Sequence, residues 1–203
     1  MATSPAGSLR DLNKQRLRRR IIESATSLVA ARGLDAVTAD AIAAEAEVGR
    51  ATFFRYFDSK ESAIIVGFYE QRLTALVGML GVAPRNLSPM DAVIWTFREL
   101  GERAGKELKL VRLHARMVTR SPALRAKAFE FHSRYEQAIA DAVAPRFKRP
   151  RADDVRPRAL AAAALAVIQA CIEHWAARRE SLDLTRLVLS ALDQLKSGFT
   201  EAA

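Results

Sequence analysis

Apolar residues recur along the chain at the three- and four-residue spacing that marks one face of a helix. Between Asn13 and Gly33 the apolar positions share one side of a helix, and Gly33 is a residue type that commonly ends one. The same pattern predicts further helices at 39–46, 50–57, 59–80, 89–104, 107–120, 122–143, 155–178 and 183–199. The sequence contains no alternating strand pattern and no hairpin signal. The chain is therefore predicted to be all-α, with about nine helices.

Two of the predicted helices are short and closely spaced. The Thr38 hydroxyl can cap the first, and Val37 and Ile42 occupy the positions of a hydrophobic staple. Only the three residues "EVG" separate this helix from the next, which Gly49 can cap. Two short helices joined by a tight turn predict a helix-turn-helix.

The second short helix, "RATFFRYF", has two different faces. At 100° per residue Phe53 and Phe57 fall on one side, which is predicted to pack on the two preceding helices. The other side carries hydrogen-bond donors suited to base edges and phosphates in a DNA major groove. The candidate DNA-binding residues of this helix are Arg50, Thr52, Phe54, Arg55 and Tyr56.

Further candidate DNA contacts flank this helix. In a helix-turn-helix the second helix enters the major groove while the first crosses the DNA backbone. Thr38 and Lys60 would therefore lie near the phosphates on the two sides of that groove. Residues 1–20 contain six Lys or Arg residues against Asp11 alone. Arg18 and Arg19 in this basic arm would follow the DNA backbone or enter a minor groove. The alternative is that this arm is only solvated or disordered and makes no specific contact with DNA.

Composition narrows the choice of partner and compartment. The formal charge of +9 and the pI near 10.3 favour a polyanionic partner, whether nucleic acid, anionic lipid or a phosphorylated small molecule. Cys171 is the only cysteine, so an internal disulfide is excluded and a reducing cytoplasm is predicted. No signal-peptide pattern and no apolar run of about 20 residues is evident, so no membrane association is expected.

The sequence contains no motif that indicates an enzyme. There is no glycine-rich phosphate loop, nucleophile elbow or metal-ligand pair, and His114, His132 and His174 lack metal-ligand spacing. The protein is predicted to be a non-enzyme without catalytic residues, metal or cofactor.

The stretch "VTADAIAAEAEVGRATFFRYFDSKESAI" resembles the DNA-binding domain of the TetR family of bacterial transcription regulators. The resemblance is carried by Thr38, Ile42, Ala43, Ala46, Val48, Thr52, Tyr56, Phe57, Lys60 and Glu61. Two positions depart from the family: Glu47 stands where Gly is usual, which suggests a strained turn costing roughly 1 kcal/mol, and Phe54 stands where Tyr is frequent. The composition predicts a disordered basic arm at 1–12, followed by the helix-turn-helix DNA-binding domain at 13–60. The resemblance implies that residues 61–203 form a helical ligand-binding and dimerisation domain.

By the same resemblance, the last two helices pair with those of a second subunit. A two-fold homodimer would bind a pseudo-palindromic double-stranded operator, most simply as a repressor. The competing hypothesis is a helical module that binds an anionic small molecule or protein and has no DNA role.

The segment from Arg112 to Arg146 and the alanine-rich helix after it are similar to the TetR branch thought to sense acyl-CoA-like molecules, including mycofactocin-associated regulators. Lys109, Arg112, Arg116 and Arg120 form a cationic stripe that either binds an anionic, hydrophobic or acyl-CoA-like effector or only faces water. The aromatic residues nearby are interpreted as core or as pocket lining. The candidate effector-binding residues are Trp95, Arg112, Leu113, Arg116, Met117, Phe129, His132, Gln169 and Trp175.

Overall fold

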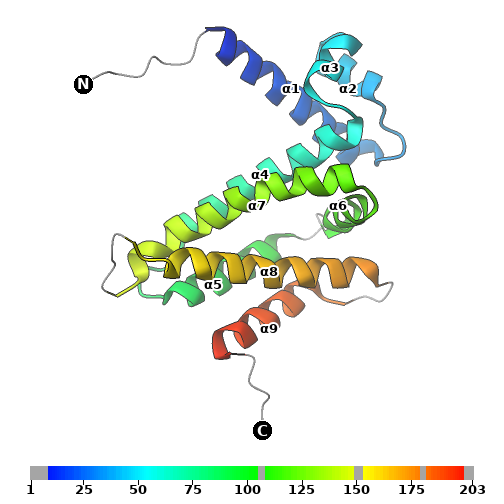
Figure 1. The fold of residues 1–203 in the computed structure, drawn as a ribbon. Coiled ribbons are helices and arrows are strands. Elements are labelled where there is room, and N and C mark those ends of the chain that lie inside the picture. The colour runs from blue at the N-terminus through cyan, green and yellow to red at the C-terminus, as the bar shows by residue number, and fades with distance from the viewer. Residues whose placement is uncertain (1–8, 105–107, 149–152, 179–181, 199–203) are drawn as a thin grey trace, which may run out of the picture. The chain divides into compact units, whose positions relative to one another are not determined.

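The computed structural model describes residues 9–104, 108–148, 153–178 and 182–198, and within these ranges the chain is all-helical. The elements are α1 (Leu9–Arg32), α2 (Ala39–Glu45), α3 (Arg50–Tyr56), α4 (Lys60–Val82), α5 (Pro89–Ala104), α6 (Leu108–Arg120), α7 (Pro122–Val143), the 3-10 helix η2 (Ala144–Arg146), α8 (Arg156–Ala177) and α9 (Leu184–Ser197) (Figure 1). The chain divides into two compact units, residues 1–68 and 69–203. The predicted all-α fold is confirmed.

Local sequence signals set most helix boundaries. The Thr38 hydroxyl accepts a hydrogen bond from the Ala41 amide at 3.0 Å, which is the predicted cap of α2. At the start of α4 the capping hydroxyl belongs to Ser59, which accepts from the Ser62 amide at 3.0 Å.

The first helix begins earlier than the sequence indicated. Residues 9–12, assigned to a disordered arm, form the first turn of α1, and residues 1–8 of that arm lie outside the described residues. Leu and Arg are strong helix formers, and Asp11 in the first turn complements the helix dipole. These local preferences extend the helix beyond its packed part.

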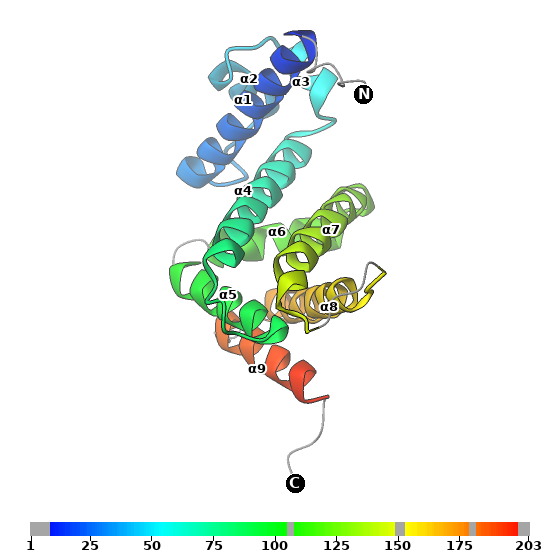
Figure 2. The same cartoon turned by 90° about the vertical axis from the view of Figure 1, so that its left-hand side faces the viewer.

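The N-terminal unit is built around a small apolar core. Ile21 from α1, Ile42 from α2 and Phe53 from α3 are all fully buried. Gly67 of α4 allows close approach to α1, because a Cβ added at Gly67 would lie 2.4 Å from the Thr26 hydroxyl oxygen. The unit therefore holds the two helices of the predicted helix-turn-helix in a fixed relation to α1 (Figure 2).

In the C-terminal unit α8 packs against α7 and α9, and α9 packs against α5. The contact between α5 and α9 is close, because a Cβ added at Gly101 would lie 2.3 Å from the Thr185 methyl carbon. The Arg146 guanidinium donates to the carbonyls of Ala83, at 3.0 Å, and Pro84, at 2.7 Å. Arg146 thus joins the end of α7 to the loop that follows α4.

The helices α4 and α8 are long and apolar enough to cross a bilayer by length and composition alone. No membrane-spanning segment was expected from the sequence, because charged residues interrupt or bound the longest apolar runs. Half of the apolar window of α4 and 39% of that of α8 are buried inside the protein. Core helices of globular proteins have the same composition, and α8 packs like a core helix, against α6, α7 and α9.

Candidate DNA-binding surface and effector groove

The helix α3 has the two faces predicted from the sequence. Phe53 and Phe57 are 0% and 2% exposed, and their ring centroids are 6.0 Å apart. Arg55 is exposed, while Thr52 and Tyr56 are partly exposed. The buried face anchors the helix, so the donor-bearing face stays accessible.

Two candidate residues at the start of α3 are linked to each other and to α2. Arg50 forms an ion pair with Asp40 in which both side chains remain largely exposed. Its guanidinium also lies 5.1 Å from the centroid of the Phe54 ring, and Phe54 is 42% exposed. These contacts restrict Arg50 before any ligand binds.

Lys60 has a structural role that the sequence did not indicate. Its ammonium donates to the carbonyls of Leu34, at 3.1 Å, and Val37, at 2.7 Å. An ammonium has three donors, so two of them hold the loop between α1 and α2. The predicted phosphate contact of Lys60 could use only the third.

The candidate cations of α1 also make contacts inside the protein. The Arg18 guanidinium lies 5.7 Å from the centroid of the Phe57 ring, and Arg19 forms an exposed ion pair with Glu23 at 2.7 Å. Both lie on a regular helix and not on a flexible arm.

The turn between α2 and α3 is strained at the position where the sequence departs from the TetR pattern. Glu47 has a φ of +51°, and it is the only non-glycine residue with positive φ in the described part of the chain. Arg20 of α1 donates to the Ala46 carbonyl at 2.6 Å and to the Glu47 carboxylate at 2.7 Å. The guanidinium therefore stabilises a turn that the backbone alone disfavours.

Replacing Arg20 with alanine is expected to lower the free energy of unfolding by about 1–2 kcal/mol, because the Ala46 carbonyl loses a charge-assisted partner. Urea unfolding followed by circular dichroism measures the change. The control is Arg19→Ala, which removes only an exposed pair and should cost less than about 0.5 kcal/mol. Equal effects of the two substitutions would contradict a role for Arg20 in the turn.

The candidate effector residues do not gather around one cavity. The Arg112 guanidinium lies 3.9 Å from the centroid of the Trp175 ring and donates to the Arg178 carbonyl at 2.7 Å. The Trp175 indole donates to the Leu182 carbonyl at 2.9 Å, and only 4% of this side chain is exposed. Arg112 and Trp175 thus fix α6 to the C-terminal end of α8.

The other candidates lie at or near the surface. The interpretation of Phe129 as a core residue is wrong, because this side chain is 73% exposed and stacks on His132. Gln169 is exposed and donates to Glu173. Arg116 is exposed, and the partly exposed candidates are Trp95, Leu113 and Met117.

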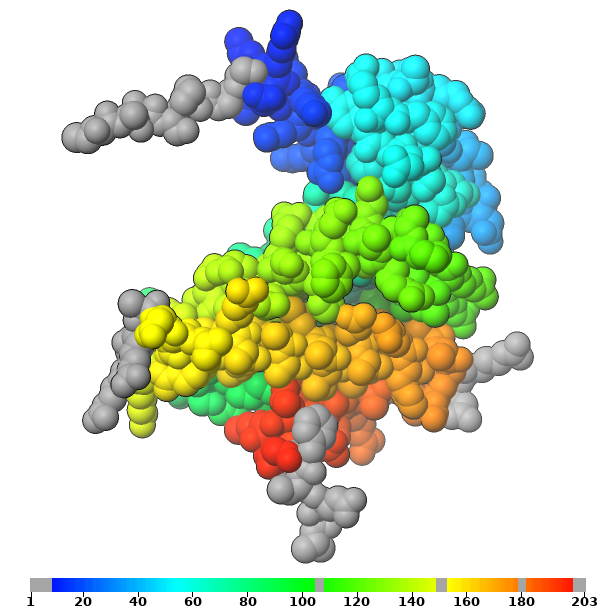
Figure 3. All heavy atoms as spheres, in the orientation of Figure 1, coloured from blue at the N-terminus to red at the C-terminus, as the bar shows by residue number. Residues whose placement is uncertain are grey.

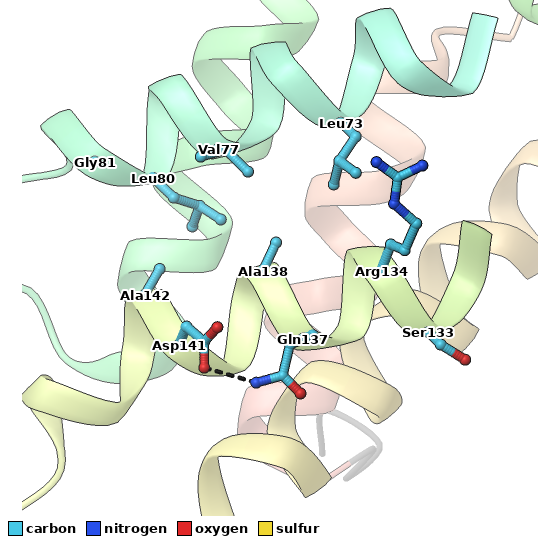
Figure 4. Close-up of a pocket in the computed structure, with 10 residues that line it drawn as sticks. All are labelled: Leu73, Val77, Leu80, Gly81, Ser133, Arg134, Gln137, Ala138, Asp141 and Ala142. Atoms are coloured by element: carbon cyan, nitrogen blue, oxygen red, sulfur yellow. Dashed lines mark hydrogen bonds between the residues drawn. The ribbon is translucent and has the colours of Figure 1, made fainter. Parts of the chain in front are cut away.

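A groove between α4 and α7 was not identified from the sequence. Its volume is about 710 Å³, and Leu73, Val77 and Leu80 of α4 face Ala138 and Ala142 of α7 across it (Figure 4). Their spacing of three and four residues was visible in the sequence, but this spacing equally predicts a packed helix pair. None of the candidate effector residues lines the groove.

The groove has polar side chains along one side, and hydrogen bonds connect the two chain segments beyond each of its ends. Arg134 reaches from α7 toward Leu73, and Gln137 donates to Asp141 at 2.7 Å (Figure 4). Beyond one end the Tyr135 hydroxyl donates to the Tyr69 carbonyl at 3.0 Å, and beyond the other is the Arg146 contact with the loop after α4. The groove is apolar in its walls and carries a cation at one side.

A buried aromatic cluster adjoins the first of these ends. The Tyr69 ring packs against Phe131, with centroids 5.0 Å apart, and edge-on against His114 at 4.6 Å. Burial lowers the pKa of His114 to about 3, helped by the nearby Arg72 charge. Burial also raises the pKa of Tyr69 to about 12 and raises that of Tyr135. All three side chains are therefore uncharged near neutral pH.

Among the residues that the structure describes, no group of three or more His, Cys, Asp or Glu side chains is placed to hold a metal ion.

Comparison with known proteins relates both units to one family. Residues 21–62 match the family described as "Bacterial regulatory proteins, tetR family", and residues 87–200 match "MftR C-terminal domain". The regulator TcmR of Streptomyces glaucescens is 31% identical over 206 residues, which cover 96% of this chain and 89% of TcmR. MftR of Mycobacterium tuberculosis, whose name assigns it to mycofactocin biosynthesis, is 30% identical over 178 residues, covering 88% of each chain.

Solved structures agree with this relationship. The FadR repressor of Thermus thermophilus, crystallised with lauroyl-CoA, superposes with a TM-score of 0.72 at 25% identity, over 92% of this chain and 96% of that one. FadR of Bacillus subtilis, crystallised with stearoyl-CoA, has a TM-score of 0.56 at 20% identity, over 89% and 98% of the two chains, and supports the fold. The family consists of DNA-binding regulators and not of enzymes, which disfavours the hypothesis of a module without a DNA role. The chain belongs to the TetR family of transcriptional regulators, with a C-terminal domain of the MftR type.

Proposed function

We propose that the protein is a homodimeric repressor that binds a pseudo-palindromic operator and is released by an amphipathic, acyl-CoA-like effector. The observation that carries the DNA-reading part is the orientation of α3, which buries Phe53 and leaves Thr52 and Arg55 accessible. In this proposal the protein acts in the cytoplasm, where its operator is found.

The accessible face of α3 would enter the major groove. Thr52 and Arg55 offer a hydroxyl and a guanidinium to base edges, and the phenol of Tyr56 can reach a phosphate. The residues proposed to contact DNA are Arg18, Arg19, Thr38, Arg50, Thr52, Phe54, Arg55, Tyr56 and Lys60.

A homodimer through α8 and α9 is supported by the uncovered side of α8. The exposed residues Ala159, Ala162, Ala166 and Ala170 follow one another at three- and four-residue spacing. Figure 3 shows the surface of α8, in yellow to orange, uncovered along its length. Small side chains allow a second helix to approach closely, and sedimentation as a monomer at micromolar concentration would contradict this interface.

The groove between α4 and α7 is the proposed site for the effector. Its walls suit an acyl chain, and the Arg134 guanidinium suits an anionic head group. Support comes from the FadR repressor of Thermus thermophilus, which was crystallised with lauroyl-CoA. Release of DNA would follow if the ligand binds the non-binding conformation more tightly.

Selection of bound duplexes from a random pool, followed by anisotropy titration, tests the DNA-reading part. The selected sites should be two-fold symmetric, with half-sites about one helical turn apart. Thr52→Ala should reduce the preference for the selected site over random DNA by about 1–3 kcal/mol. Retention of the full preference would contradict base reading by α3.

Titration of the operator complex with lauroyl-CoA tests the effector site. Ala138→Phe should fill the groove and abolish release, whereas Ala126→Phe, an exposed position of α7 outside the groove, should leave release unchanged. If Arg116→Ala weakens the response and Arg134→Ala does not, the head group binds the cationic stripe predicted from the sequence. Operator binding that is insensitive to acyl-CoA of any chain length would reject this effector class.

A further inference from the structure

Because α1 begins at Leu9, its first turns form a cleft beside α3. Arg10, Asn13, Lys14 and Leu17 lie on one face of α1, at three- and four-residue spacing. Together with Arg55 and Tyr56 of α3 they line a cleft of about 410 Å³. The cleft lies wholly within the N-terminal unit.

The lining of this cleft is cationic. It contains two arginines, a lysine, an amide and a phenol, and no carboxylate. Among the described residues no ion pair is recorded for Arg10, Lys14 or Arg55, although the Arg55 guanidinium lies 5.6 Å from the centroid of the Tyr56 ring. Like charges that share a small volume repel one another, so an anion would relieve the repulsion.

Other cations of α1 have partners within the protein. Arg19 pairs with Glu23, and Arg20 bonds to the turn after α2. Among the described residues, the α1 cations that line the cleft, Arg10 and Lys14, thus take no part in the ion pairs that Arg19 and Arg20 make.

We propose that this cleft binds a backbone phosphate of the operator at the edge of the half-site read by α3. The inference rests on the proposed DNA reading, because Arg55 and Tyr56 belong to the same helix as Thr52. A duplex engaged by that helix would bring its backbone past the cleft, where Arg10, Asn13 and Lys14 donate to phosphate oxygens. Arg10, Asn13 and Lys14 are then DNA-binding residues held by a helix and not by a flexible arm.

The salt dependence of operator binding tests the assignment. Arg10→Ala and Lys14→Ala should each lower operator affinity about threefold to tenfold. Each should also reduce the slope of log affinity against log salt by about 0.9, the value for one lost phosphate contact. A backbone contact carries no sequence information, so the ratio of operator to random-DNA affinity should stay unchanged in both variants.

The matched control is Arg16→Ala, which removes the same charge from the same part of α1 outside the cleft lining. An equal fall in slope for Arg16→Ala would show only general electrostatic attraction and overturn the inference. Ethylation interference adds a positional readout: ethylating one phosphate at the margin of the half-site should weaken wild type but not the Arg10→Ala, Lys14→Ala double variant.

Inorganic pyrophosphate distinguishes DNA from a free phosphorylated ligand. If wild type binds pyrophosphate through the cleft, and the double variant loses this binding with no change in the DNA salt slope, the cleft serves a small anion and the inference fails. Wild type that binds no duplex would refute the proposed function itself. Wild type that binds normally, with unaltered slopes in both cleft variants, would refute only the phosphate site.

Discussion

Phe53→Ala is expected to unfold the N-terminal unit and abolish operator binding. Phe53 is fully buried, and truncating a buried phenylalanine typically costs about 3–5 kcal/mol through lost burial and the cavity left behind. A unit as small as residues 1–68 has little stability in reserve. Circular dichroism should show loss of helix at 25 °C, and anisotropy should show no operator binding.

Phe54→Ala is the matched control, because the two phenylalanines are adjacent but face different surroundings. Phe54 is 42% exposed, so its truncation should cost less than about 1 kcal/mol. This variant should remain folded and lose only the DNA contacts proposed for the exposed ring. If both variants melt alike, the assignment of a buried and an exposed face to α3 is wrong.

Acidification is expected to destabilise the C-terminal unit through His114. The pKa of His114 is lowered from 6.5 to about 3 in the folded protein, so the unfolded chain binds the proton more tightly. The stability contributed by the neutral imidazole is fully present above about pH 6.5. It is lost at about 1.4 kcal/mol per pH unit as the pH falls toward 3, or about 2 kcal/mol at pH 5.

Urea unfolding at several pH values measures this loss for wild type and for His114→Gln, which cannot titrate. The readout is the slope of the unfolding free energy against pH, so a uniform loss of stability in the variant does not obscure it. His174→Gln, at an exposed position of α8, controls for removing a histidine. Equal slopes in wild type and His114→Gln would show that the cluster of Tyr69, Phe131 and Tyr135 does not keep the imidazole neutral.

The sequence alone predicted the helices and several of their caps. Helices α5 and α7 begin and end at the residues that the apolar pattern predicted, and Thr38 caps α2 as predicted. The burial of Phe53 and Phe57 also followed from the sequence. These features depend on neighbours within a few residues, so their physical causes can be read from a short stretch of chain.

Only the tertiary structure decided what the long polar side chains touch. Lys60 bonds to carbonyls 26 and 23 residues away, and Arg112 bonds to carbonyls 63 and 66 residues away. A lysine or arginine can satisfy its donors with phosphate, water or any nearby carbonyl, and its position in the sequence does not choose among them.

The groove between α4 and α7 and the cleft beside α3 likewise required the structure. A helical stripe such as Leu73, Val77 and Leu80 predicts that a face is apolar, but not whether a neighbouring helix packs against it or stands apart. The sequence by itself determined the helices, the family resemblance and which face of α3 is buried and which is exposed. The structure decided which charges are used inside the protein and where space remains for ligands, because both depend on contacts between residues far apart in the chain.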